Sequence, residues 1–297
     1  MQPGCYTVSD GMIGTYPDLT ALDLADREIL DPLFRGLGEG VSELSFAGIY
    51  CFRHSHGYRV ARLTDGTIVL AGDDKGQSFF VCPFALPGPD LLDQLFQRFG
   101  TMKLVTESQA EPLRQAGLLV SEDRDNFDYL YPREALATLA GRALQRKRNL
   151  VHRFVKHHDY QAFPLAAERT ADALGVLEAW REGARDQADY APARDALAHA
   201  REFGLVGSVY YVGQTPAGYT LGEYVAAGTM FVVHYEKAIP DIKGLYQVIN
   251  MDFARSLPAT CTRINREQDL GDPGLRQAKL TYRPSGFVKK FRARRPG

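Results

Sequence analysis

The chain has 297 residues, of which 45% are hydrophobic and 24% charged, and its formal net charge is −1. This length accommodates one large domain or two of ordinary size, with enough apolar residues for sizeable cores. The near-neutral charge excludes a chain-wide field for nucleic acid or membrane, so a cationic surface has to be local. The four scattered cysteines form no CxxC pair, which argues against a zinc or redox motif and favours reduced thiols in the cytoplasm.

The start of the chain, MQPGCYTVSDGMIG, lacks the basic and apolar regions of a signal peptide, and no apolar run approaches ~18 residues. We therefore expect a cytoplasmic protein with no transmembrane segment.

The first half of the chain predicts mixed helices and strands. Asp26 is a candidate N-cap for a short helix, and Pro89 can open a helix whose apolar residues recur at helical spacing. β-rich runs lie between these helices. The predicted elements are a helix from Asp26, strands at 44–52, 58–63 and 67–71, a helix from Pro89, a strand at 104–106, a short helix at 111–116 and a strand at 127–131.

The second half predicts the same succession of elements. Its first helix carries Leu174, Leu177 and Trp180 on one face, and a second helix follows Lys243. The predicted elements are a helix at 171–184, strands at 207–212, 218–224 and 229–235, a helix after Lys243, a strand at 261–265, a short helix at 274–280 and a strand at 287–291.

Internal similarity supports a duplication. The sequence LRQAGL at 113–118 returns as LRQAKL at 275–280, a separation of 162 residues. Gly57–Tyr58 matches Gly218–Tyr219, and Gly66–Thr67 matches Gly228–Thr229, at nearly the same separation. We predict an α+β fold with two related domains, at 1–132 and 161–297, joined by a connecting helix at 133–160.

The predicted connector contains a concentrated run of cations. Residues 134–150 are rich in strong helix formers, and no acidic residue occurs between 142 and 158. Arg146, Lys147 and Arg148 are candidates for binding the phosphates of a nucleic acid, a lipid head group or a coenzyme. The alternative is a solvated connector helix. The three histidines of this run have no ligand spacing that would support a metal site.

The densest polar motif, INREQDLG at 264–271, follows a predicted strand, and QAKLTYRP begins shortly after it. Arg266, Arg276 and Lys279 can neutralise an anionic substrate, whereas Glu267 and Asp269 can accept a proton or orient an amine. Asn265 belongs to the same candidate substrate site. The alternative is a fold-stabilising turn in which Asp269 caps the following helix and pairs with Arg266.

A second polar group ends the third predicted strand of the second half. His234 and Glu236 stand there and are candidate acid–base residues. The alternative for His234 is a partly buried histidine whose hydrogen bonds are satisfied.

With these motifs, the chain resembles the family named for the C-terminal catalytic domain of phosphatidylglycerol lysyltransferases, which includes many bacterial proteins and corresponds to the DUF2156 type. The segments that carry the resemblance are SELSF at 42–46, GYRV at 57–60, RKRN at 146–149, HYEK at 234–237, INREQDLG at 264–271 and LRQAK at 275–279. The resemblance implies two tandem GNAT-like domains. It also implies an acyl- or aminoacyltransferase, with aminoacyl-tRNA as candidate donor and an anionic lipid or small molecule as candidate acceptor.

The GNAT resemblance raises acyl-CoA as an alternative donor, which would need a glycine-rich turn at a helix N-terminus. In the second half only Lys243 and Gly244 remain of such a turn, and the first half offers Gly88 between two prolines. We assign no resident cofactor. Two alternatives to aminoacyl transfer stay open, namely a CoA-dependent N-acetyl- or acyltransferase and a non-catalytic binding protein that retained the fold.

Overall fold

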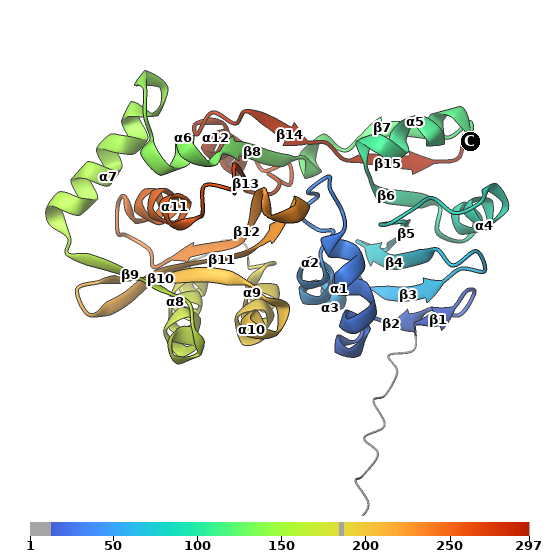
Figure 1. The fold of residues 1–297 in the computed structure, drawn as a ribbon, viewed down its shortest axis with the longest axis horizontal. Helices are drawn as coiled ribbons and strands as arrows, with labels where there is room; N and C mark the ends of the chain where they lie inside the picture. The colour runs from blue at the N-terminus through green and yellow to red at the C-terminus, as the bar shows by residue number, and fades with distance from the viewer. Residues whose placement is uncertain (1–12, 184–186, 297) are drawn as a thin grey trace, which may run out of the picture. The chain divides into compact units, whose positions relative to one another are not determined.

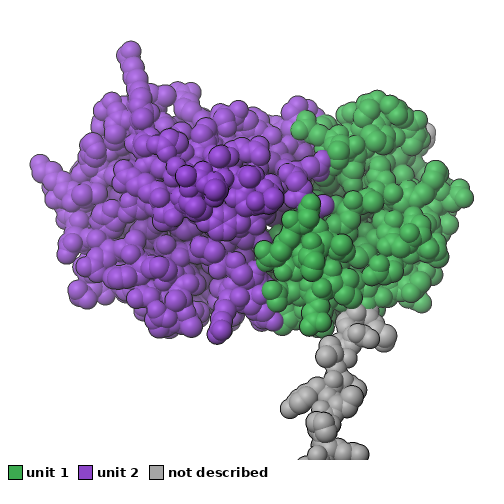
Figure 2. All heavy atoms as spheres, viewed as in Figure 1, with its two compact units in different colours: residues 1–36, 44–121, 291–297 green, residues 37–43, 122–290 purple. Residues whose placement is uncertain are grey.

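The structure, a computed structural model, describes residues 13–183 and 187–296. The predictions that involve Cys5 and Ala184 lie outside these residues. The chain forms two compact units, which Figure 2 shows in different colours. The first comprises residues 1–36, 44–121 and 291–297, and the second comprises residues 37–43 and 122–290.

The first unit is built on one sheet with the strand order β1-β3-β4-β5-β6-β15-β7, and β2 pairs with β3 (Figure 1). Leu92, Leu95 and Phe96 of α4 and Leu113 of α5 pack in the core that the sheet and these helices enclose. Its elements are β1 (Gly14–Thr15), β2 (Thr20–Ala21), α1 (Arg27–Arg35), α2 (Phe46–Cys51), α3 (Arg53–His56), β3 (Arg59–Arg62), β4 (Ile68–Asp74), β5 (Gln77–Val81), α4 (Pro89–Phe99), β6 (Thr101–Val105), α5 (Glu107–Gln115), β7 (Leu119–Glu122) and β15 (Phe291–Arg294).

The second unit is built on a sheet with the order β14-β8-β13-β12-β11-β10-β9. Helices α7 and α11 contribute Phe154, Ile249 and Phe253 to its core, and α8 packs on β11 and β12. Its elements are β8 (Asp128–Pro132), α6 (Arg133–Thr138), α7 (Gln145–His157), β9 (Tyr160–Pro164), α8 (Thr170–Gly183), α9 (Tyr190–Ala198), α10 (Ala200–Phe203), β10 (Val206–Val212), β11 (Thr215–Val225), β12 (Met230–Ala238), α11 (Leu245–Ser256), β13 (Arg263–Asn265), α12 (Pro273–Leu280) and β14 (Gly286–Val288).

The two sheets repeat one topology. In each sheet three antiparallel strands, β3-β4-β5 or β10-β11-β12, are followed by a parallel strand, β6 or β13. An antiparallel strand then follows, β15 on β6 or β8 on β13. The predicted α+β fold of two GNAT-like domains related by duplication is therefore confirmed.

The last strands are exchanged relative to the predicted division of the chain. The strand expected at 127–131 in the first half is β8 of the second sheet, whereas β15, near the end of the chain, joins the first sheet. The compact units therefore differ from the predicted domains 1–132 and 161–297. Both strands are short and largely buried, so their hydrophobic pattern carries no information on which sheet they join.

Two predicted elements were wrong. Residues 46–51 form α2 instead of a strand, because the Ser45 hydroxyl caps the helix by accepting the Gly48 N–H at 2.9 Å. The connecting helix expected from 134 to 150 is broken after α6, where Gly141 has a φ of 82°. The matches of Gly57–Tyr58 and Gly66–Thr67 also join strands that are not equivalent, whereas LRQAGL and LRQAKL do fall on the equivalent helices α5 and α12.

Within the described ranges, no helix combines the length and the apolar character needed to cross a bilayer.

Candidate active site

The predicted polar residues of the second unit gather where two parallel strands part. β12 pairs with β13 only as far as Val232 and Asn265, after which β12 continues to Ala238 without β13 beside it. His234 and Glu236 stand on this extension, and the 265–271 motif begins where β13 ends. The diverging carboxyl ends of the two strands therefore bring together two motifs that are far apart in the sequence.

Two cations, Arg266 and Lys147, lie beside the Tyr282 ring at this place, and the charge of Lys279 interacts with that of Arg266. The Arg266 guanidinium bonds Glu236 at 3.0 Å and lies 5.0 Å from the centre of the Tyr282 ring. The Lys147 ammonium, on α7, lies 4.2 Å from the centre of the same ring. Burial and the Arg266 charge lower the pKa of both Lys147 and Lys279, the latter to about 8. With Glu236 as the carboxylate that pairs with Arg266, the cluster carries excess positive charge and suits an anionic ligand.

Lys279 also holds the backbone of the motif. Its ammonium donates hydrogen bonds to the carbonyl oxygens of Arg266 and, at 3.2 Å, Glu267. Glu267 has a φ of 54°, a conformation that non-glycine residues rarely adopt. Lys279 thus fixes the loop that positions the Arg266 side chain, and it is less exposed than its sequence position suggested.

The His234 imidazole lies between two carboxylates and bonds both. Nδ1 lies 2.7 Å from Glu267 and Nε2 lies 3.0 Å from Glu223. Burial would lower the pKa of the imidazole, but the two carboxylates outweigh burial and raise it to about 10. His234 is therefore a doubly protonated imidazolium at neutral pH and has no lone pair with which to accept a proton.

Asp269 is fully buried in a second ionic cluster. Arg276 donates two hydrogen bonds to its carboxylate, at 2.7 and 2.9 Å, and Tyr129 and Arg124 donate two more. Although burial opposes ionisation, these hydrogen bonds hold the pKa of Asp269 well below its usual range. The helix α12 is capped by Asp272, which accepts the Leu275 N–H, and Arg266 pairs with Glu236 instead of Asp269.

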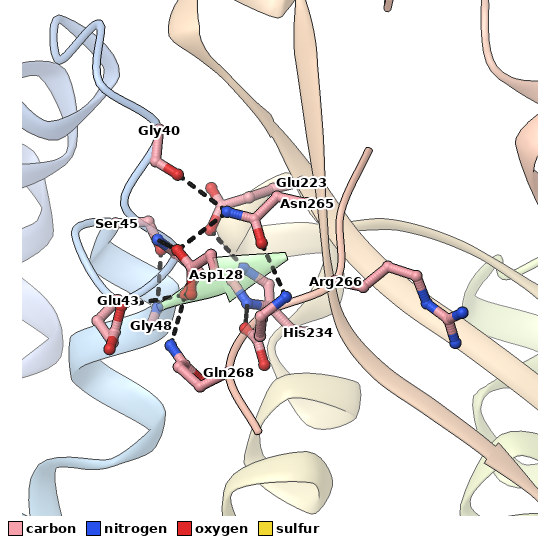
Figure 3. Close-up of polar contacts among 12 residues, drawn as sticks. Gly40, Glu43, Ser45, Gly48, Asp128, Glu223, His234, Asn265, Arg266 and Gln268 are labelled. Atoms are coloured by element: carbon pink, nitrogen blue, oxygen red, sulfur yellow. Dashed lines mark hydrogen bonds and ion pairs between the residues drawn. The ribbon is translucent and has the colours of Figure 1, made fainter. Parts of the chain in front are cut away.

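Asn265 belongs to a buried polar network shown in Figure 3. Its amide donates to Asp128 and to the Gly40 carbonyl, both at 3.0 Å, and its side-chain oxygen accepts the Glu267 N–H at 2.7 Å. Arg266 points away from this network (Figure 3). Asn265 thus belongs to the buried network, whereas the next residue, Arg266, belongs to the cation cluster around Tyr282.

The network continues through residues that sequence reasoning missed. Ser42 donates to Asp128 at 2.9 Å and accepts from Gln268 at 2.8 Å. Lys290, fully buried, bonds Asp128 at 2.6 Å and pairs with Glu43. Burial raises the pKa of Glu43 to about 6 despite the Lys290 charge. No local sequence pattern marks Asp128, Lys290 or Tyr282, because partners come from distant parts of the chain, such as Ser42 for Asp128 and Lys147 for Tyr282.

The candidate phosphate-binding residues separate into different environments. Arg146 and Lys243 are exposed, and Lys147 reaches the Tyr282 cluster. Arg148 donates to the carbonyl oxygens of Leu139 and Gly141 and so supports the turn before α7. Among the described residues, no group of three or more histidine, cysteine, aspartate or glutamate side chains is arranged so that it could hold a metal ion.

Neither helix N-terminus carries the features of a binding site for coenzyme A, the donor that a GNAT fold suggests. Gly244, before α11, is buried under α7, where an added Cβ would lie 2.7 Å from the Leu150 carbonyl oxygen. The turn before α11 therefore packs against the α7 backbone, and it keeps only Lys243 and Gly244 of a pyrophosphate-binding turn. In the first unit, Asp65 accepts the Gly88 N–H at 3.2 Å, and Pro89 removes an N–H from the first turn of α4.

We therefore expect no acetyl-CoA binding by either unit. Isothermal titration calorimetry of the full chain with acetyl-CoA should show no heat of binding up to 1 mM ligand, about the weakest affinity of interest for a donor. A micromolar dissociation constant would contradict the packing argument.

Comparison with known proteins places this site in a family. Residues 34–294 match the family model described as "Phosphatidylglycerol lysyltransferase, C-terminal". The match spans most of the chain, and the protein belongs to this family.

Other known proteins are similar to the chain in sequence or in fold. A conserved protein of unknown function from Bacteroides thetaiotaomicron is 27% identical, with a TM-score of 0.84 over 94% of this chain and 99% of that one. The C-terminal domain (DUF2156) of a putative lysylphosphatidylglycerol synthetase from Agrobacterium fabrum is 12% identical and shares the fold, with a TM-score of 0.64 over 92% of each chain. An uncharacterized protein of Mycoplasmoides gallisepticum is 24% identical over 185 residues, which are 58% of this chain. The match spans 57% of that relative's length.

Proposed function

We propose that the protein is an acyltransferase that moves an aminoacyl group from an ester donor, aminoacyl-tRNA, to an amine or hydroxyl acceptor. The observation that carries the proposal is the convergence of Lys147, Arg266 and Lys279 beside Glu236 and Tyr282 at the diverging strands of the second unit. The family to which the chain belongs is named for such a transfer, of lysine to phosphatidylglycerol.

In the proposed reaction the acceptor's nitrogen or oxygen attacks the ester carbonyl, and the bond from that carbonyl to the ribose oxygen breaks. The acceptor loses one proton and the ribose oxygen gains one, so the step balances without a cofactor. Glu236 is the proposed proton acceptor, since it borders the cluster and is partly exposed. Arg266 and Lys147 hold the anionic part of a substrate and stabilise negative charge on the carbonyl oxygen.

The other predicted residues take positioning roles in this proposal. His234 lies between two carboxylates, Asp269 and Arg276 each bond two or more side chains, and Asn265 and Glu267 bond within the motif, so these five residues hold the loop that presents Arg266. Lys279 contributes charge to the cluster and supports the same loop. An anionic lipid or a small molecule is the proposed acceptor. A non-catalytic binding protein with this fold would keep the anion site but would not need Glu236.

Replacing Glu236 by glutamine tests the proposal. The amide keeps a hydrogen bond to Arg266 but cannot accept the acceptor's proton, so we expect the transfer rate to fall by about 10²-fold with little change in donor affinity. The assay follows radiolabelled lysine from lysyl-tRNA into phosphatidylglycerol vesicles and into a soluble amine.

Glu182→Gln is the matched control, because Glu182 is an exposed residue of α8. A Glu236→Gln protein that is as active as the Glu182→Gln protein would remove Glu236 from the proposed chemistry.

A further inference from the structure

Helix α7 has two chemically different faces. The inward face buries Val151 and Phe154 in the core and directs Lys147 to the Tyr282 ring. The outward face is polar and carries an unbroken set of exposed side chains, and α7 contains no acidic residue. The exposed residues of that face are Gln145, Arg146, Asn149, His152, Arg153, Lys156 and His157.

The cations of the outward face form a line. Arg146, Arg153 and Lys156 are seven and three residues apart, so they follow one side of the helix over about 15 Å at ~1.5 Å per residue. The line is therefore long enough to contact more than one phosphate of a polynucleotide backbone, whose charges repeat along the strand.

The outward face lacks what a lipid-binding helix needs. Interfacial helices combine a cationic face with large apolar residues that enter the acyl region. In α7 the apolar side chains Val151 and Phe154 are 3% and 1% exposed, and they are held in the core of the second unit. Val155, 49% exposed, is a single valine beside the cations and not an aromatic or leucine wedge. The charge and the missing apolar wedge favour a polynucleotide backbone over a bilayer.

We propose that the outward face of α7 binds the phosphate backbone of an RNA through Arg146, Arg153 and Lys156. The inference rests on the proposed aminoacyl-tRNA donor and identifies where its RNA part is held. The adjacent residues Arg146 and Lys147 lie on different sides of α7, about 100° apart, so one helix links the RNA surface to the site around Tyr282. Arg148, which supports the preceding turn, is outside the proposed surface.

The test measures binding of fluorescent, deacylated tRNA to the full chain by anisotropy at several salt concentrations. The triple variant Arg146→Gln, Arg153→Gln, Lys156→Gln should bind roughly 100-fold more weakly at low salt, since three phosphate contacts are lost. The slope of log affinity against log salt should fall by about 2, at ~0.7–0.9 per lost phosphate contact.

A control variant with the same change of charge, Lys75→Gln, Arg194→Gln, Arg201→Gln, alters exposed residues outside α7. Equal weakening in the control and the α7 variant would overturn the proposal, as would unchanged tRNA binding by the α7 variant. Binding to phosphatidylglycerol vesicles without binding to tRNA would overturn it in favour of a lipid surface.

The experiments distinguish a failure of the proposed RNA surface from a failure of the proposed transferase function. If the wild-type protein transfers lysine but the α7 variant keeps its tRNA affinity, only the RNA surface is wrong. If α7-dependent tRNA binding is found but no transfer occurs with any acceptor, the surface stands and the transferase proposal fails.

Discussion

Replacing His234 by glutamine is expected to lower the free energy of unfolding by about 3 kcal/mol at pH 7, because it removes the cation between two carboxylates. Glu223 is almost fully buried, and Glu267 is about three-quarters buried. Glutamine can donate to one of them but cannot neutralise either. Urea denaturation followed by circular dichroism measures the loss.

The effect should depend on pH with a definite sign. The pKa of His234 is raised in the folded protein from 6.5 to about 10. The stabilisation is therefore complete below pH 6.5 and is lost as the pH rises through 10, by at most about 1.4 kcal/mol per pH unit. The stability difference between the wild-type protein and His234→Gln should shrink over this window. Lys279, whose pKa is about 8, titrates in both proteins and cancels in the difference.

His157→Gln is the control, since His157 is exposed at the end of α7. Its stability should stay within about 0.5 kcal/mol of the wild-type value. A difference between wild type and His234→Gln that is constant from pH 6 to 10 would show that His234 is neutral in the folded protein.

The second large effect is expected at Lys290. Lys290→Met should destabilise the protein by about 3–5 kcal/mol, because the fully buried Asp128 carboxylate would lose its cation while keeping only neutral donors. Thermal and urea unfolding both report this loss.

The adjacent Lys289 provides a matched control. Its side chain is 43% exposed and pairs with an exposed glutamate, so Lys289→Met should change stability by less than about 1 kcal/mol. Adding Asp128→Asn to Lys290→Met should restore part of the loss, since the unpaired charge is then removed. Equal effects at 289 and 290 would contradict the buried network.

The sequence predicted the elements whose signals are local. Pro89 opens α4 as expected, and the spacing of apolar residues after Lys243 predicted α11. The exchange of β8 and β15 could not be predicted, because a short buried strand does not encode its partner. Residues 46–51 were misread because an apolar run of this length suits a strand or a buried helix, and the Ser45 cap decides between them.

The sequence predicts which residues gather at the candidate site better than it predicts the role of each residue. The 265–271 motif and His234–Glu236 do lie at one place in the second unit. Glu267 and Arg276, which pair with His234 and Asp269, were among the predicted residues. The further partners Glu223, Arg124 and Tyr129 are connected to the motif by no spacing rule. Tyr282, around which the cations gather, followed the LRQAKL repeat without any signal of its own.

The central claim is that the second unit transfers an aminoacyl group from tRNA and not an acyl group from coenzyme A. The most direct measurement incubates the full chain separately with radiolabelled lysyl-tRNA and with radiolabelled acetyl-CoA, each in the presence of phosphatidylglycerol vesicles and a soluble amine. We predict enzyme-dependent transfer from lysyl-tRNA that Glu236→Gln reduces by about 10²-fold, and no transfer from acetyl-CoA. Transfer from acetyl-CoA alone, or from neither donor, would contradict the account.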